Sequence, residues 1–280
     1  MKKLLLLILL FIIFSCYSAS FYDITPPEII FTTFLEKDFL IQFNEPVKYL
    51  EIYTNQKRLE FINAFPKANI FLNSDMLEKY KPNNIIVKSV DTFNNKGEKE
   101  ILNVFNNPDP AILSINEIRL KYTKKLNQMI SFRVEKEGNL AGLQLNIFIR
   151  DKKETITFES CNVRNNEILK INFLYNKDIT NRDTIDFSKS RVVNFEFNKR
   201  LSQGSSLIFV VDHKNMLLDY ILYYDSKKNS LQELKNKKTF NNYLSLLKKY
   251  NITEVCYTDI VGNTSKKTIF KDKNRYLVKK

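Results

Sequence analysis

The chain has 280 residues, of which 44% are hydrophobic and 27% are charged, which is ordinary for a globular protein. At roughly 150 residues per domain this length allows one or two domains. The formal net charge of +13 favours anionic partners such as nucleic acid, glycosaminoglycan or phospholipid head groups. Because the lysines are dispersed, a solvated surface on a lysine-rich chain is the alternative. A single histidine excludes any metal site built from several histidines.

The N-terminus predicts an export signal. Two lysines precede an unbroken apolar run from Leu4 to Phe14, and a short basic region followed by about 7–15 apolar residues is typical of a secretory signal. The run is shorter than the ~20 residues that a membrane-spanning helix needs. We therefore expect residues 1–16 to be a signal peptide with a lipobox and the remaining chain to be exported.

Cys16 stands where a lipoprotein signal peptidase leaves a lipidated cysteine. The preceding Ile-Phe-Ser is an imperfect lipobox, because Phe14 is bulky, and it resembles the loose lipoboxes of spirochaetal lipoproteins. An acyl chain on Cys16 would anchor the protein to the inner or outer membrane of a bacterial envelope, periplasmic or surface-exposed. The alternative is ordinary cleavage beyond Cys16, for example after Ser18 or Ser20.

Residues 23–105 contain short β-rich runs separated by turn signals, which predict a β-sandwich. These runs are 28–34, 39–43, 49–53, 69–72 and 85–90. Two prolines flank Asp109 in the segment 106–110 and would stop both a helix and a strand. We therefore predict a linker at 106–110.

Residues 111–280 predict a second β-sandwich with a helix near 231–250. The strand candidates are 111–119, 128–135, 143–150, 154–159, 167–173, 192–197, 206–211, 217–224 and 254–258. The run Leu207–Val211 is continuously apolar, as in a central strand. Apolar residues recur at helical spacing from Phe240 to Tyr250, so an amphipathic helix is expected there, docked on the sandwich. The expected fold is all-β, with two tandem Ig-like β-sandwiches and one inserted amphipathic helix in the second.

Three short motifs lie in residues 23–105: DITPP at 23–27, IQFNEPV at 41–47, and Asp91 followed by Asn95-Lys96-Gly97. They are similar to the opening, the Phe-x-Glu-Pro-Val strand and, in altered order, the late Asp…Gly-Asn turn of bacterial Ig-like modules of the S-layer type. The resemblance implies an Ig-like sandwich in an envelope protein.

Three further motifs lie in the second half: SINEI at 114–118, NLAGLQL at 139–145 and SKKTI at 265–269. They resemble the first strand, a turn with its strand, and the closing motif of the lamin-tail domain family, although Leu143 stands where that family usually has Trp. The resemblance implies binding, scaffolding or tethering and no reaction. Gly142 allows a turn that a side chain would strain.

The sequence offers few residues that could carry catalytic chemistry. His213 follows an apolar strand and is more simply a turn residue than a lone acid–base group. Asp183 and Asp186, with Asp178 upstream, could serve a hydrolase that uses carboxylates alone, and the oxygen-rich segment 176–183 could form a weak calcium site. Without a glycine-rich phosphate loop or EF-hand spacing, we predict no enzyme, no cofactor, no metal site and no small-molecule substrate.

Cys161 and Cys256 each lie near a strand-like segment. In an oxidising compartment they could form a disulfide, and the alternative is two buried thiols. The chain has no CxxC motif, so neither a zinc ribbon nor a redox site is indicated.

The basic C-terminus is the best candidate for a polyanion-binding patch, with a solvated tail as the alternative. Its residues are Lys266, Lys267, Lys271, Lys273, Arg275, Lys279 and Lys280. The sequence therefore predicts a non-catalytic, membrane-anchored envelope lipoprotein that binds, scaffolds or adheres to a protein or an anionic polymer. The alternative is a polyanion-binding protein that recognises nucleic acid or glycosaminoglycan through this patch.

Overall fold

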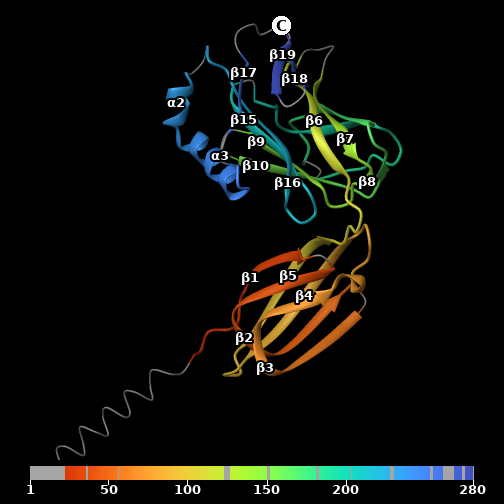
Figure 1. Cartoon of the computed structure of the whole chain (residues 1–280), viewed down its shortest axis with the longest axis vertical. Coiled ribbons are helices and arrows are strands. Elements are labelled where there is room, and N and C mark those ends of the chain that lie inside the picture. The colour runs from red at the N-terminus through yellow and green to blue at the C-terminus, as the bar shows by residue number, and fades with distance from the viewer. Residues whose placement is uncertain are drawn as a thin grey trace, which may run out of the picture. The chain divides into compact units, whose positions relative to one another are not determined.

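The computed structural model in Figure 1 describes residues 23–35, 37–55, 57–122, 127–149, 152–180, 183–202, 204–227, 230–252, 255–260, 268–272 and 275–279. These residues form an all-β structure with several sheets. The chain divides into an N-terminal unit, up to Leu77 together with 83–102, and a C-terminal unit, 78–82 together with the residues from 103 onward. Within the described ranges, no helix has both the length and the hydropathy to cross a membrane.

The N-terminal unit is built on one five-stranded sheet. Its elements are β1 (Ile29–Leu35), β2 (Asp38–Thr54), β3 (Lys57–Asn73), the 3-10 turn η1 (Ser74–Met76), β4 (Pro82–Asp91) and β5 (Lys96–Phe105). β2 pairs with β3 along one edge, and with β1 and then β4 along the other. The runs 39–43 and 49–53 therefore belong to one strand.

A bulge in β2 switches the face that this strand buries. The buried residues are Phe39, Ile41, Phe43 and Val47 before the bulge, and Leu50, Ile52 and Thr54 after it. Val47 pairs with Asp91 and Tyr49 with Val90, which leaves Lys48 as an extra residue. Because side chains alternate with a period of two, one extra residue moves the buried set from odd to even numbers.

The C-terminal unit contains two six-stranded sheets and a two-stranded ladder. The first sheet runs in the order β13 (Thr184–Ile185), β10 (Lys152–Phe158), β9 (Gln144–Ile149), β15 (Ser206–Val211), β16 (Leu217–Tyr224) and β17 (Tyr257–Asp259). The second runs in the order β14 (Val192–Phe197), β12 (Ile168–Tyr175), β7 (Gln128–Lys136), β6 (Ile112–Arg119), β18 (Thr268–Asp272) and β19 (Arg275–Lys279). β8 (Gly138–Asn139) pairs with β11 (Asn162–Val163).

These two sheets share a hydrophobic core, which is consistent with a β-sandwich. Phe132 from the second sheet and Ile147, Ile208 and Val210 from the first belong to one buried cluster. The intervening residues of β15 are also buried, because they pack against helices on the outer face of the first sheet. The continuously apolar run Leu207–Val211 is thus buried on both faces.

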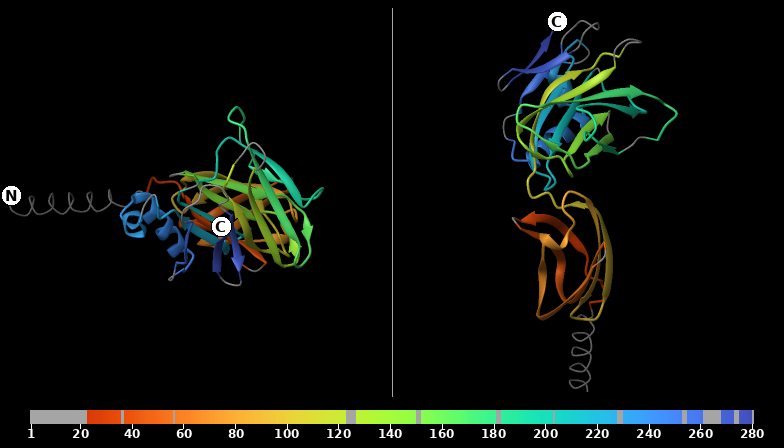
Figure 2. Two further views of the ribbon diagram at one scale, coloured as in Figure 1. Left: turned by 90° about the horizontal axis from the view of Figure 1, so that it is seen from above. Right: turned by 90° about the vertical axis from the view of Figure 1, so that its right-hand side faces the viewer.

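Two helices lie between β16 and β17: α2 (Leu231–Lys235) and α3 (Lys238–Lys249). The apolar side of α3 presents Phe240, Tyr243 and Leu247, all buried, to the outer face of the first sheet. Figure 2 shows both helices beside this sheet. The segment 231–250 is therefore divided near Asn236, and its apolar stripe is covered by the unit itself.

The segment 106–110 is packed into the C-terminal unit. Asn107 is buried, and its Nδ2 donates hydrogen bonds of 2.9 Å to the carbonyl oxygens of Asn139 and Ala141. A buried amide satisfied in this way fixes the local backbone. The residues predicted as a linker therefore behave as a structural part of that unit.

Candidate functional site

A pocket of ≈490 Å³ lies in the C-terminal unit and is the principal candidate site. Three separate parts of the sequence line it: the segments near 80 and near 105, strand β10 with its exit, and the segment 183–188. The residues that matter for its chemistry are Tyr80, Phe105, Glu159, Asp183, Asp186 and Ser188. The pocket combines aromatic rings with carboxylates and hydroxyls, which is the usual make-up of a ligand site.

Backbone contacts position each wall of the pocket. The amide of Tyr80 donates to the carbonyl of Asn106 at 2.9 Å, which joins the first two segments. The amide of Thr157 donates to the carbonyl of Asp183 at 2.7 Å, and that of Glu159 donates to Ile185 at 2.8 Å. These bonds hold β13 parallel to β10, so the carboxylates that flank the two strands line the same pocket.

Asp186 is held in its charged form. Its carboxylate accepts hydrogen bonds from the backbone amide of Ser188 at 2.7 Å and from the Ser188 hydroxyl at 2.8 Å. The hydroxyl and then the amide of Ser188 lower the pKa of Asp186, because both bonds stabilise the ionised carboxylate. Asp186 is therefore negative at neutral pH.

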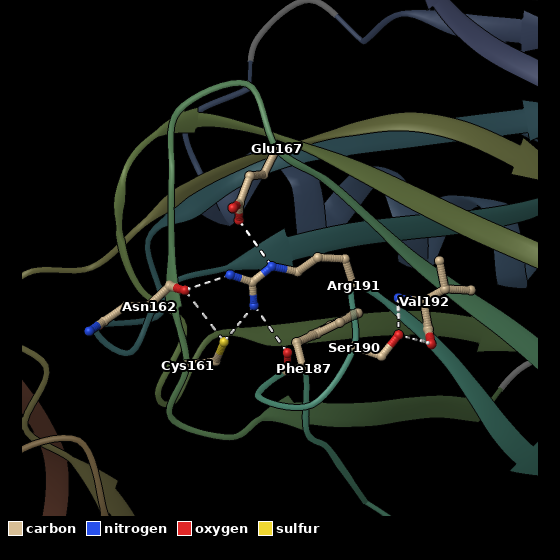
Figure 3. A network of polar contacts seen from close by, with 7 residues as sticks. All are labelled: Cys161, Asn162, Glu167, Phe187, Ser190, Arg191 and Val192. Carbon is tan, nitrogen blue, oxygen red and sulfur yellow. Dashed lines mark hydrogen bonds and ion pairs between the residues drawn. The ribbon is translucent and has the colours of Figure 1, made fainter.

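An arginine network holds the segment that carries these carboxylates (Figure 3). Arg191 Nη1 donates to Cys161 Sγ at 2.9 Å and to the carbonyl of Phe187 at 3.0 Å. Its Nη2 donates to the carbonyl of Asn162 at 3.0 Å, and its Nε lies 3.1 Å from Glu167 Oε2. One guanidinium thus links three loop segments, at 161–162, 167 and 187, and fixes the backbone next to Asp186.

The N-terminal unit carries a second cluster. One carboxylate oxygen each from Asp23, Glu45 and Asp91 lie within 4.8 Å of one another. Asp91, which is fully buried, accepts from the amides of Phe93 and Asn95 at 2.8 Å and from Asn95 Nδ2 at 2.7 Å. The same Nδ2 donates to the carbonyl of Asp23 at 2.9 Å. Three motifs that are distant in the sequence therefore meet here.

The convergence of three carboxylates changes the protonation of Glu45. Desolvation first, and then the negative charges of Asp23 and Asp91, raise the pKa of Glu45. Two responses are chemically available to such a group: Glu45 keeps a proton, or the oxygens hold a hard cation, which prefers carboxylate and carbonyl ligands. Among the residues that the structure describes, these three are the ones that could hold a metal ion.

Two of the three carboxylates that the sequence marked as candidate catalytic groups lie in the pocket. Asp183 and Asp186 both line the pocket, whereas Asp178 does not. His213 lies in the turn between β15 and β16, away from the pocket lining, and burial lowers its pKa to about 4. The histidine is therefore neutral at pH 7.

The predicted basic patch lies only partly inside the described residues. Lys271 belongs to β18, and its Nζ lies 3.0 Å from Asp219 Oδ2 in a pair whose side chains are 25% and 14% exposed. Arg275 and Lys279 belong to β19, and their side chains are not described. Lys266, Lys267, Lys273 and Lys280 fall outside the described ranges, as do Cys16 and the leader.

Both candidate disulfide partners are free thiols in the structure. Cys161 is buried, and its sulfur accepts the hydrogen bond from Arg191. Cys256 is exposed, and its amide donates to the hydroxyl of Tyr220 at 3.3 Å. The pairing that the sequence left open is therefore not formed here.

The geometry defines an all-β chain whose C-terminal unit carries a polar, aromatic-walled pocket. Comparison with known families adds one finding: residues 111–276 match a family described as a protein second domain. This match spans more than half of the chain, so the chain belongs to that second-domain family. No curated protein matches the sequence.

Sequence reasoning identified two of the pocket carboxylates and missed the aromatic wall. Tyr80 and Phe105 lie far upstream of Asp183, and the bridge between Lys79 and Asn106 brings their two segments together. Nothing in their local sequence signals this pairing. Asp23, Glu45 and Asp91 belong to three separate sequence motifs, and the acidic residue in each motif was the one signal that they could meet.

Proposed function

We propose that this protein is an exported, lipid-anchored, non-catalytic binding protein of a bacterial envelope, built from tandem Ig-like β-sandwiches with helices inserted in the second. The observation that carries the binding role is the pocket of the C-terminal unit. It gathers aromatic, hydroxyl and carboxylate groups from three distant segments, which is the arrangement of a recognition site.

The charge states support binding over catalysis. A hydrolase that uses two carboxylates needs one with a raised pKa to act as the acid. In the pocket, the pKa of Asp186 is lowered. Asp186 therefore does not meet this need.

The anchor rests on the sequence of the leader. The basic start, the apolar run and Cys16 together favour lipidation, and an acyl chain would hold the protein at a membrane without a spanning helix. The Ig-like and lamin-tail resemblances favour the same class of tethered binding module.

Metabolic labelling with a fatty acid tests the anchor. In a bacterial host, we expect the wild-type chain to be labelled and Cys16→Ala to lose the label completely. Cys256→Ala is the matched control, because it removes an exposed cysteine and leaves Cys16 in place; it should label as strongly as wild type. A labelled Cys16→Ala, or an unlabelled wild type, would refute the anchor.

Polyanion binding is the second candidate function. A pocket of ≈380 Å³ in the C-terminal unit is lined by Arg133 and Lys271 among other residues. Glu135, which accepts a hydrogen bond from the hydroxyl of Ser114, lines the same pocket. An anionic group could enter beside Arg133, because Lys271 is already paired with Asp219, and the basic C-terminal residues would add long-range attraction.

A further inference from the structure

The pocket of the C-terminal unit has a charge opposite to that of the chain. Glu159, Asp183 and Asp186 line it together with one lysine, Lys81, in a protein of formal net charge +13. Lys81 is itself occupied, because its Nζ lies 3.0 Å from the carboxylate of Glu78. A lysine-rich composition does not account for a wall of carboxylates at a cavity.

We propose that this pocket binds an alkyl-ammonium or guanidinium group, carried either by a basic peptide or by a free polyamine. The inference deepens the binding role proposed above by naming the ligand class, and it does not depend on the lipid anchor.

The carboxylates supply the charge recognition. Glu159 and Asp183 are exposed at the pocket, and no ion pair with another described residue engages either side chain. Asp186, which is held by Ser188, lines the same pocket. A cation placed among these groups gains charge-assisted hydrogen bonds, which are shorter and stronger than neutral ones.

The aromatic wall suits the rest of such a ligand. Tyr80 and Phe105 are half-buried, and they line the same cavity as the carboxylates. Lysine, arginine and polyamines all carry methylene chains that pack on apolar surface while the charged end stays polar. A cation over an aromatic face is attracted by the negative charge density of the ring. An anionic or purely apolar ligand would use only part of this wall.

The edge of the sheet offers a further contact to a peptide. β13 ends the order of its sheet among the described strands. The ladder with β10 uses the carbonyls of Asp183 and Ile185, so the backbone groups of Thr184, which lies between them, point away from β10. An extended peptide can pair with such an edge, whereas a polyamine cannot.

Titration calorimetry on the full chain in detergent tests the proposal. The probes are spermidine, an acetyl-trilysine amide, and the same peptide with all three side-chain amines acetylated. We expect the wild type to bind at least one charged probe, the acetylated peptide to bind at least about tenfold more weakly, and added salt to weaken binding. Binding of spermidine alone identifies a polyamine site, and binding of the peptide alone or more tightly identifies a peptide site.

Paired variants locate the binding. Glu159→Gln/Asp183→Asn removes two charges from the pocket and should weaken binding at least about tenfold. Glu100→Gln/Glu137→Gln removes two charges from exposed positions elsewhere and should bind as wild type does. Circular dichroism checks that both variants fold. Wild type that binds neither charged probe, or equal affinity of the two double variants, would overturn the ligand class. Loss of fatty-acid labelling would instead concern only the anchor.

Discussion

Two glutamates on β2 show how neighbouring side chains set the effect of one charge. Desolvation and the carboxylates of Asp23 and Asp91 raise the pKa of Glu45. Glu51 has the opposite environment: hydrogen bonds from Tyr49, Arg58 and Tyr53 lower its pKa to about 2. The same residue type on the same strand therefore opposes folding at one position and favours it at the other.

The pH dependence of two variants tests this contrast. Glu45 binds its proton more tightly in the folded state, so its stabilising contribution is present below the unfolded pKa of about 4.3 and is lost as the pH rises through the folded value. Glu45→Gln should therefore gain stability relative to wild type between pH 3.5 and pH 7. Glu51 contributes stability above about pH 4.3, and that contribution is lost as the pH falls toward 2. Glu51→Gln should therefore be less stable than wild type at pH 7, and the difference should shrink in acid.

Urea unfolding in the presence of EDTA measures both differences. Circular dichroism or tyrosine fluorescence can follow it, because the chain has 14 Tyr and no Trp. EDTA removes divalent cations that would otherwise neutralise the N-terminal carboxylates. If the two variants changed stability in the same direction with pH, the charge environments assigned to Glu45 and Glu51 would be wrong.

At the scale of elements, the turn at Gly142 needs a glycine for two reasons: its backbone conformation and its close packing against Phe105. Its φ is +77°, a conformation that side chains rarely adopt, and a Cβ there would lie 2.5 Å from the Cβ of Phe105. Because Phe105 lines the pocket, this glycine also positions one of its walls. A side chain at position 142 would therefore strain the backbone, as the sequence indicated, and would also clash with Phe105, a residue 37 positions upstream.

Gly142→Ala should destabilise the C-terminal unit by about 2–4 kcal/mol, because the backbone strain and the clash act together. Asn166→Ala is the matched control, since Asn166 also has a positive φ, of 64°, but is exposed. It should cost only about 1 kcal/mol. Urea unfolding compares the two, and equal costs would show that the contact with Phe105 adds nothing.

The sequence predicted most elements from local pattern and missed those that depend on distant partners. The alternation and apolar runs of β6, β7, β15 and β16 were recognisable, because burial repeats along each strand. β5 was not predicted, since its charged sequence from Lys96 to Glu100 gains its strand form from pairing in the sheet. The bulge at Lys48 and the packing of Asn107 were also not predicted, because both depend on residues that are distant in the sequence. For the site, the sequence marked Asp183 and Asp186, and only the fold brings Tyr80 and Phe105 into the same pocket.

At the scale of the whole molecule, charge is distributed unevenly. The formal net charge is +13, yet carboxylates converge at a pocket in one unit and at a cluster in the other. Lys271, which belongs to the predicted basic patch, is paired with Asp219. A polyanion would therefore have to be recognised by Arg133 and the remaining basic residues near the C-terminus. The effect of the total net charge has to be separated from the effect of a localised basic patch.

Two variants with equal net charge make that separation. The first replaces Lys266, Lys267, Lys273, Arg275, Lys279 and Lys280 with Gln. The second replaces Lys37, Lys57, Lys67, Lys96, Lys99 and Lys152 with Gln, all exposed positions in the structure. Each variant loses six positive charges, which takes the formal net charge from +13 to +7.

The polyanion proposal predicts different salt dependences for these variants. Each phosphate contact that is lost lowers the slope of log affinity against log salt by about 0.9 for duplex DNA. The C-terminal variant should therefore lose several units of slope, whereas the dispersed variant should keep most of it and lose affinity mainly at low salt, where screening is weak. Filter binding or fluorescence anisotropy over a salt series measures the slope. Equal slopes in the two variants would assign the binding to net charge, and a wild type without measurable affinity at low salt would remove polyanion recognition from the functions of this chain.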